Sequence, residues 1–463
     1  MHSEHHGHTT GGRQSRHRTF LVVTGLTLAS VSAVIVVAWL LSLTVTGSFD
    51  SIIPGAPPIF ILVAAALFVM VVIGASALIE ALSLLPQVRP SDPASHTRHP
   101  TGACRITVII PAHNEQATLP GTLASLDRQT RLADRIVVVA DNCSDLTTDV
   151  ALQAGCSVIE TQGNQGRKAG ALNQALARLL PSSDERDFFL LMDADTQLSP
   201  RFIAAATEVL AYDGDMAAVG GVFAGDGRPG LLAQLQRNEF ARYARQISAR
   251  RGRVSVLTGT ATLFRADTLE RVAAHRGDIL PGMRGMVYEE SAITEDNELT
   301  LALKTLGAHV VSPRECSVET ETMPSVPTLW TQRVRWQRGA LDNLSDYGVR
   351  ASTARYWVQQ WGLAYGSIAL PTSLFVLFAI PIIIGQWALL PFWLAVAAIF
   401  SVERGLTAWD TGWRGRLIAF SLVPEIIYDL FLQACFLRAM SGMVSSRDIA
   451  WGHLPAAMAE ARS

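Results

Sequence analysis

Two aspartates one residue apart, Asp193 and Asp195, end a run of bulky apolar residues in Phe188–Thr196 (FFLLMDADT). Such a run is typical of a strand that is buried on both faces of a parallel sheet. The strand would deliver both carboxylates to its carboxyl end, where open α/β sheets bind ligands. Because two close carboxylates repel each other, we expect a hard divalent cation that links them to phosphate oxygens. A lone D-x-D is more often a solvated turn, so this assignment depends on the surrounding sequence.

The surrounding sequence alternates short apolar segments with helical patterns. We predict strands at 105–110, 135–140 and 157–160, and helices near 115–128, 144–154 and 168–180. This alternation is typical of a parallel sheet with right-handed crossovers. The sequence from 102 to 336 has the length and composition of one globular domain.

Polar side chains gather where the predicted strands end. Glu115 follows the first strand, Asp141 the second, and the aspartate pair the last. Because the carboxyl ends of parallel strands share one edge, we expect a nucleotide crevice there. No glycine-rich phosphate fingerprint follows the first strand, which argues against a dinucleotide or P-loop site. Asp141 would accept hydrogen bonds from a base or ribose, or would cap the following helix, as Ser144 also would.

Three further groups of residues are candidates for chemistry. Lys168 begins a predicted helix and would neutralise a phosphate or nucleobase oxygen, although a solvated lysine fits the pattern equally. Glu295 and Asp296 precede a helical pattern at 297–306; they would favour its dipole, or Asp296 would act as a general base. The segment 331–338 (TQRVRWQR) would form a basic belt next to the membrane. Alternatively, its guanidinium groups would bind a diphosphate and its indole would stack on a sugar ring.

The composition indicates a membrane protein, because 49% of the 463 residues are apolar and only 17% are charged. Phe20–Val45 and Ile59–Ile79 carry no ionisable side chain, and each is long enough to span a bilayer. We interpret the first as an uncleaved anchor, since its apolar stretch is too long for a signal peptide. The basic N-terminal tail and the middle of the chain would then face the cytoplasm.

The C-terminal third contains a second apolar block. Trp357–Val402 has no charge and suits two packed spans. Leu417–Leu437 contains Glu425 and Asp429, so it is either a fifth span whose acids face protein or an interfacial helix. Residues 341, 344 and 347 fall at helical spacing and would lie along the membrane interface.

Other features exclude some classes of function. The net charge of −2 argues against a nucleic-acid partner. Five cysteines without regular spacing give neither a zinc pattern nor a disulfide framework, as expected in a reduced compartment. The four histidines within the first eight residues suit a disordered polar tail better than a metal site.

The order of the motifs resembles the membrane-embedded, processive family 2 glycosyltransferases, which make cellulose, chitin, hyaluronan and poly-N-acetylglucosamine. The resemblance covers about 102–340 and the two preceding spans. The family's D-x-D is Asp193–Asp195 here, its T-E-D is Thr294–Asp296, and its Q-(Q/R)-x-R-W is Gln332–Trp336. Each motif is short, but their order along the chain is specific.

The resemblance implies a GT-A fold and an inverting hexosyltransferase that uses a UDP-sugar, with N-acetylglucosamine or a related hexose as the donor sugar. It implies Mg²⁺ or Mn²⁺ as cofactor, and a growing glycan or lipid-linked acceptor. The implied residue roles are metal binding by Asp193 and Asp195, nucleotide binding by Glu115, Asp141, Lys168 and Asp193, catalysis by Asp296 with Glu295, diphosphate binding by Gln332, Arg333 and Arg335, and acceptor binding by Trp336.

The implied organisation is a multi-pass protein of the plasma membrane with a cytoplasmic catalytic domain. Its expected parts are a disordered tail (1–19), two spans (20–86), the catalytic domain (102–336), an interfacial helix (337–356), membrane or interfacial helices (357–440) and a C-terminal tail (441–463).

The chain departs from the family pattern at three places. Asp141 alone represents a D-D-G-S type run, Trp451–His453 matches a W-G-T-R segment poorly, and the C-terminal membrane block is small for a secretion channel. Two alternatives therefore stay open. One is a transferase that adds a single sugar to a polyprenyl phosphate or glycolipid, and the other is a catalytically silent membrane protein with a nucleotide fold.

Overall fold

The computed structural model describes residues 104–385 and 390–444, and these form two compact units. The sheet unit comprises 104–326 together with 407–415, and the helical unit comprises 327–385, 390–406 and 416–444. The predicted N-terminal tail, the two N-terminal spans and Trp451–His453 lie outside the described residues.

The apolar run forms β4 (Phe188–Met192), and all five of its residues are buried. β4 pairs in parallel with β1 (Ile106–Ala112), which pairs in parallel with β2 (Arg135–Ala140). β3 (Ser157–Glu160) lies parallel to β2. The prediction of these four parallel strands is confirmed, and it places the ends of β1, β2 and β4 at one edge of the sheet.

The strands on the other side of β4 are not all parallel to it. The strand order is β3-β2-β1-β4-β8-β6-β9, in which β8 (Ala261–Arg265) is antiparallel to β4 and to β6 (Met216–Gly220). β9 (His309–Val311) is parallel to β6. The sheet is therefore mixed, because a buried apolar run fixes neither the direction nor the neighbours of a strand.

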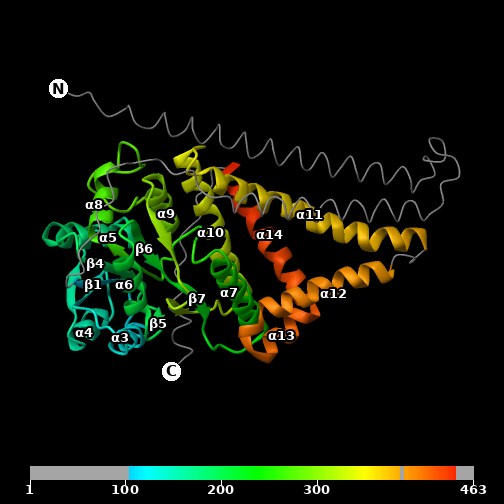
Figure 1. Cartoon of the computed structure of the whole chain (residues 1–463), viewed down its shortest axis with the longest axis horizontal. Coiled ribbons are helices and arrows are strands. Elements are labelled where there is room, and N and C mark those ends of the chain that lie inside the picture. The colour runs from blue at the N-terminus through cyan, green and yellow to red at the C-terminus, as the bar shows by residue number, and fades with distance from the viewer. Residues whose placement is uncertain (1–103, 386–389, 445–463) are drawn as a thin grey trace. The chain divides into compact units, whose positions relative to one another are not determined.

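Helices cover the sheet, as Figure 1 shows. The helices of the sheet unit are α3 (Leu119–Asp127), α4 (Thr147–Gln153), α5 (Arg167–Leu179), α6 (Phe202–Tyr212), α7 (Leu231–Ala249), α8 (Ala266–His275) and α9 (Glu295–Thr305). A continuous core of β1, β4, α3 and α6 side chains lies beneath them.

The first two helices begin three or four residues later than predicted. β1 and β2 are each followed by an asparagine with positive φ, Asn114 (57°) and Asn142 (50°), which turns the chain before the helix begins. Pro120 then occupies the first turn of α3, where its missing N–H costs nothing. The delay leaves two polar loops at the carboxyl edge of the sheet.

A second, three-stranded sheet contains β5 (Gln197–Leu198), β10 (Ser317–Thr320) and β7 (Val222–Gly225), in that order. The sheet unit also includes the separate segment 407–415, which contains the short 3-10 helix η2 (Trp409–Thr411). Asn238 of α7 is fully buried and bonds to this segment.

The helical unit contains α10 (Val326–Tyr347), α11 (Ala354–Ile384), α12 (Leu390–Thr407), the greater part of α13 (Gly412–Ser421) and α14 (Val423–Val444). The first residues of α13, up to Gly415, belong to the sheet unit. Val334 of α10 packs against Cys435 and Ala439 of α14. Leu341 packs against Ala364 of α11 and Phe436 of α14. Leu341, Leu344 and Tyr347, predicted to face the membrane interface, are each at most 2% exposed, because this side of α10 contacts other protein.

Two described helices are long and apolar enough to cross a membrane, judged by length and composition: Ala354–Ala379 and Val423–Met443. The second contains the two acids that the sequence left open. Both face Arg404 of α12, which lies 2.7 Å from the Asp429 carboxylate and 3.8 Å from that of Glu425. The acids therefore face protein, as the first alternative required.

A buried ion pair joins the end of α8 to α9. Arg276 donates two hydrogen bonds to the carboxylate of Glu298, one of them at 2.7 Å, and neither side chain is more than 2% exposed. Arg276 also donates to the carbonyls of Val287 and Pro281. The pair therefore fixes the loop that precedes α9 to the first turns of that helix.

We predict that Arg276→Met destabilises the full chain in detergent by about 3–5 kcal/mol, because it leaves a buried carboxylate without its cation. Thermal unfolding measures this loss. Arg276→Met combined with Glu298→Leu should recover much of it, since an apolar pair can fill the same space. Arg314→Met, which breaks an ion pair with Asp410 that is exposed on both sides, is the control and should change the midpoint little. An unchanged midpoint in Arg276→Met would contradict the prediction.

Candidate functional site

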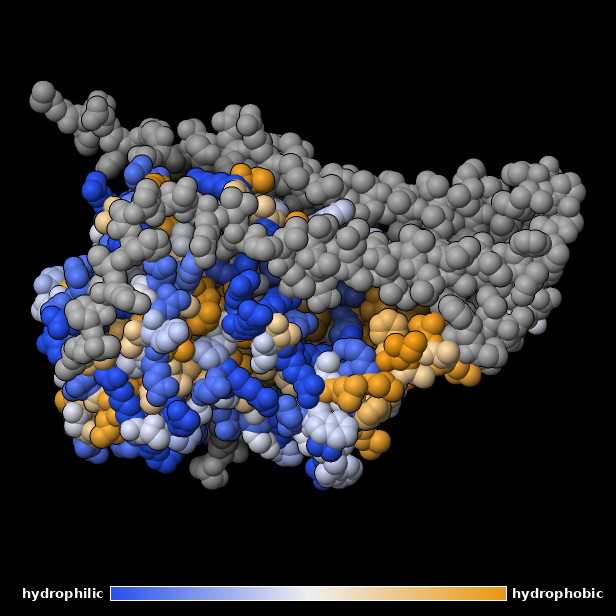
Figure 2. Space-filling model, viewed as in Figure 1, coloured by the Kyte–Doolittle hydropathy of each residue, from blue (hydrophilic) through white to orange (hydrophobic). Residues whose placement is uncertain are grey.

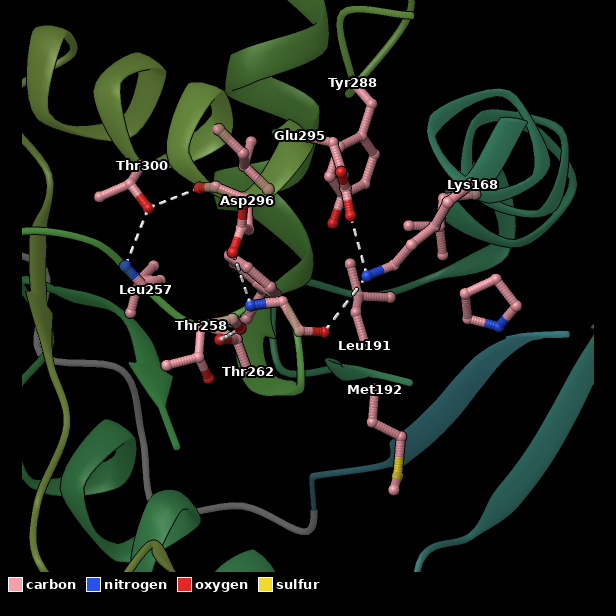
Figure 3. Close-up of a pocket in the computed structure, with 15 residues that line it drawn as sticks. Lys168, Leu191, Met192, Leu257, Thr258, Thr262, Tyr288, Glu295, Asp296 and Thr300 are labelled. Carbon is pink, nitrogen blue, oxygen red and sulfur yellow. Dashed lines mark hydrogen bonds and ion pairs between the residues drawn. The ribbon is translucent and has the colours of Figure 1, made fainter. Parts of the chain in front are cut away.

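Lys168, in the first turn of α5, joins the tip of β4 to the start of α9. Its Nζ lies 2.5 Å from Oδ1 of Asp193 and 2.9 Å from Oε1 of Glu295. It also donates to the carbonyl of Gly259 at 3.4 Å. Figure 3 shows the ammonium of Lys168 directed toward Glu295. The alternative of a solvated lysine is therefore excluded.

The charges around Lys168 determine its ionisation. Burial lowers the pKa of Lys168, but the charges of Asp193 and Glu295 outweigh this effect and raise the pKa well above its ordinary value. The lysine therefore stays charged at neutral pH. It links the D-x-D motif to the T-E-D motif, which are separated by about a hundred residues in the chain.

Asp296 is held by two backbone N–H groups. Gly259 donates to Oδ2 at 3.0 Å, and Asn297 donates to Oδ1 at 2.8 Å. Burial, together with the charge of Glu295, raises the pKa of Asp296 to about 6, although Lys168 and these two hydrogen bonds oppose the shift. The carboxylate is thus fixed in orientation and takes up a proton just below neutral pH.

Sequence reasoning missed the segment 257–262 (LTGTAT). The peptide of Gly259 donates to Asp296 and accepts from Lys168, so it connects the two groups. A Cβ at this position would lie 3.2 Å from Nζ of Lys168 and 3.3 Å from Cβ of Asp296, which leaves little room for any residue but glycine. Thr300 anchors the segment, since it accepts from the N–H of Leu257 and donates to the carbonyl of Asp296. A glycine between two threonines just before an apolar run was the available signal.

Asp195 lies among other carboxylates. Desolvation by the surrounding protein raises the pKa of Asp195 to about 7, and the charges of Asp193, Glu115 and Glu321 add to this effect. The side chain nevertheless keeps contact with solvent. Burial is also the first cause of the raised pKa of Glu115. This concentration of negative charge suits a cation. Within the described residues no three His, Cys, Asp or Glu side chains form a ready-made metal site.

Asp141 does not cap α4. Its Oδ1 accepts hydrogen bonds from Asn142, Thr161 and Asn164, at 3.0, 2.8 and 2.8 Å. The first N–H of α4 is satisfied instead by Asp145, which bonds to Thr147 at 3.0 Å. All three bonds to Asp141 end on one oxygen, and they fix the carboxylate at the end of β2.

A small cavity lies beneath the charged groups, between β4, β8 and α9. Its walls are mainly apolar, and Lys168, Glu295 and Asp296 form its polar side (Figure 3). Tyr288 also lines it and is buried; burial raises the pKa of this phenol above its ordinary value, so that it stays protonated. The side chain of Asn173 of α5 fixes the backbone of Tyr288. Its Oδ1 accepts from the N–H of Tyr288 at 2.9 Å, and its Nδ2 donates to the Tyr288 carbonyl at 3.0 Å.

The Q-R-V-R-W residues lie on α10, in the helical unit. The guanidinium of Arg333 stacks over the indole of Trp336, with 4.3 Å between its central carbon and the ring centre. Arg333 is buried, whereas Gln332, Arg335 and Trp336 are partly exposed.

Comparison with known proteins gives the following relatives. Residues 103–339 match the family described as glycosyltransferase like family 2. The chain is 28% identical over 253 residues to a probable glycosyltransferase, YdaM, of Bacillus subtilis, covering 51% of this chain and 55% of YdaM. It is 24% identical over 259 residues to poly-beta-1,6-N-acetyl-D-glucosamine synthase of Staphylococcus aureus, covering 54% of this chain and 58% of the synthase. The chain therefore spans just over half the length of these curated relatives.

Among solved structures, the fold is similar to a mannosyltransferase of Pyrobaculum calidifontis in complex with GDP-Man and Mn²⁺. The TM-score is 0.52 at 18% identity, and the similarity covers 83% of this chain and 99% of that one. This likeness supports the GT-A-like α/β fold. Since the family match spans more than half of the sequence, the chain belongs to glycosyltransferase family 2 and is a transferase.

Proposed function

We propose that the chain is a metal-dependent, inverting membrane glycosyltransferase that transfers a sugar from a UDP-sugar to a growing glycan. N-acetylglucosamine is the donor sugar we favour, in line with the similarity to the poly-N-acetylglucosamine synthase. One observation carries the proposal. Lys168 brings Asp193 of the D-x-D motif and Glu295 of the T-E-D motif to one charged centre at the carboxyl edge of the sheet.

The nucleotide would bind at this edge. Asp141, fixed by three hydrogen bonds to Oδ1, would present its other oxygen to the base or ribose, together with Glu115. Lys168 would lie beside the same nucleotide. These assignments combine the family motif with the position of the side chains around the ends of β1, β2 and β4.

A divalent cation fits the carboxylates at the tip of β4. Asp195, with its raised pKa, and Asp193 lie where negative charge is in excess. Mg²⁺ commonly binds one or two protein carboxylates and completes its ligands with substrate phosphates. Asp193 and Asp195 would hold Mg²⁺ or Mn²⁺, which when bound supplies positive charge for the diphosphate that departs.

Asp296 is the proposed general base. It would accept the proton of the acceptor hydroxyl as that oxygen attacks the anomeric carbon from the face opposite the UDP, so that the configuration inverts. The N–H groups of Gly259 and Asn297 keep the carboxylate in one orientation. Glu295 remains paired with Lys168 and precedes Asp296 in the chain, so it would help to position the base.

The Q-R-V-R-W motif supplies the remaining roles, which are assigned from sequence alone. Arg335, with Gln332 and Arg333, would bind the diphosphate, since guanidinium groups match phosphate geometry. Trp336 would stack on the acceptor sugar.

A membrane location is part of the proposal, with the catalytic site on the cytoplasmic side of the plasma membrane. Its support is the pair of candidate spans and the apolar side chains that the helical unit exposes. Figure 2 shows such side chains gathered over α12. The exposed large apolar residues of α11, α12 and α14 include Phe375, Phe378, Ile382, Leu394, Ile399, Phe400, Val402, Leu406, Val423, Ile427 and Leu437.

The product and the donor are tested together. We expect purified protein with Mn²⁺ or Mg²⁺ to release UDP from UDP-N-acetylglucosamine, and the radiolabelled product to have the size of a polymer. A one-sugar lipid adduct would establish single addition to a lipid acceptor instead. The donor panel includes GDP-mannose, because the structurally similar mannosyltransferase is in complex with GDP-Man. If no nucleotide sugar were turned over, the proposal would fail.

The role of Asp296 predicts an acid limb in the pH profile. The base must be deprotonated to work, and its raised pKa keeps the proton on up to about pH 6. The turnover rate should therefore rise with pH through about 6 and then level off. Asp296→Asn should lower turnover roughly 10²–10⁴-fold, with UDP binding nearly unchanged because Asp296 is not among the residues proposed to bind the nucleotide. Full turnover by this variant would remove Asp296 from the mechanism.

The metal assignment predicts an effect on binding as well as on activity. We expect Mn²⁺ to tighten UDP binding to the unaltered protein, measured by titration calorimetry, and to have no such effect on Asp195→Asn. The reason is that the amide removes one charged ligand. Asp278→Asn changes an exposed aspartate between α8 and α9 and is the matched control. An Asp195→Asn protein with an unchanged metal response would place the cation elsewhere.

A further inference from the structure

Segment 407–415 begins at the end of α12 and includes the start of α13, but it belongs to the sheet unit. Its docking depends on Asn238, a fully buried residue of α7. Nδ2 of Asn238 donates to the carbonyl of Gly415 at 3.2 Å, and its Oδ1 accepts from Thr411 at 2.8 Å. Gln234, one turn earlier, donates to the same Oδ1 at 3.1 Å.

The contact between Gly415 and α7 leaves no room for a side chain on Gly415. A Cβ on Gly415 would collide with Thr411 and with the Gln234 and Asn238 amides. Asp410 adds two ion pairs at the surface, with Arg314 at 3.2 Å and Arg245 at 3.7 Å. Because buried hydrogen bonds stabilise more than exposed ion pairs, Asn238 and Gln234 hold the segment, and Asp410 contributes little.

The segment also exposes two aromatic side chains. Trp409 is 44% exposed and Trp413 is 68% exposed. The guanidinium of Arg414 lies 5.4 Å from the ring centre of Trp413, and Arg414 is also exposed. Large indoles facing water are unfavourable in a soluble surface, whereas tryptophan with a neighbouring cation is enriched at the interface between membrane and water.

The chain itself keeps this surface close to a bilayer. α13 has ten residues, so it rises about 15 Å before the chain reaches α14. α14 contains the candidate span Val423–Met443. If α14 crosses the membrane, Trp413 lies within a short distance of the layer of lipid headgroups.

We propose that segment 407–415 is a membrane-surface anchor of the catalytic unit, in which Trp409 and Trp413 insert among lipid headgroups and Arg414 binds their phosphates. Asn238 and Gln234 transmit this attachment to α7. The anchor would hold the sheet unit at a fixed height above the bilayer, where a lipid-borne or emerging glycan must be met. This inference relies on the proposed membrane span of α14.

The anchor also constrains the topology. The chain leaves the sheet unit at Val326 and returns to it at Thr407. Both points must lie on one side of the membrane, because one folded unit cannot occupy both. The helices between them are α10, α11 and α12, so an even number of them crosses the bilayer. α10 is not a candidate span, so α11 and α12 cross as a pair or not at all.

The test uses the full chain in vesicles of phosphatidylcholine and phosphatidylglycerol, with single cysteines labelled by a fluorophore. Serine replaces Cys104 and Cys143, the two partly exposed native cysteines. We expect a label at Trp413→Cys to be quenched severalfold more by headgroup-level spin-labelled lipid than a label at Tyr212→Cys. Tyr212, at the end of α6, is 95% exposed and serves as the water-facing control. Equal quenching at the two positions would overturn the anchor.

A third position separates this inference from the proposed membrane location. Ile427 of α14 is 62% exposed and should be quenched by spin labels deep in the acyl chains. If Ile427→Cys is quenched but Trp413→Cys behaves like Tyr212→Cys, only the anchor is wrong. If Ile427→Cys is not quenched either, the membrane span fails and the anchor fails with it.

Discussion

The ammonium of Lys168 is the contact on which the whole site depends. It lies between Asp193 at the end of β4 and Glu295 at the start of α9, two elements that are distant in sequence. Without a cation there, Asp193, Glu295 and Asp296 would be crowded carboxylates with little water to separate their charges. One side chain from α5 therefore makes it possible for two acidic motifs to occupy the same edge of the sheet.

This arrangement divides the acids into two groups with different protonation. On the side of α9, Lys168 opposes the effect of burial, so Asp296 keeps a pKa of about 6 and is a base at neutral pH. On the side of β4, desolvation by the surrounding protein, followed by the charges of Asp193 and Glu115, raises the pKa of Asp195 to about 7. Pairs of carboxyl groups with different surroundings commonly take different chemical roles. Here the first suits proton transfer and the second suits a cation.

Sequence patterns predicted the first half of the fold because its strands are uninterrupted apolar runs and its crossovers are regular. They singled out Asp193, Asp296 and Lys168 as candidates, but did not predict that Lys168 contacts Asp193, which depends on how β4 and α5 pack. The antiparallel β8 was missed, because direction is set by tertiary contacts. Gly259 was missed because its role lies in backbone groups and in the absence of a side chain. Leu341 was placed at an interface because helical spacing does not show what a helix face contacts.

The sheet unit is formed from two separate stretches of the sequence, and this affects the order in which its parts are synthesised. When Val326 leaves the ribosome, Asn238 and Gln234 still lack their partners on segment 407–415. Roughly 80 more residues follow before Thr411 is synthesised, which takes on the order of 10 s at typical translation rates. During this interval part of α7 presents polar groups that are buried in the finished protein. Completion of the sheet unit is thus delayed until α11 and α12 have been translated, so that these two helices are made before the last segment of the unit.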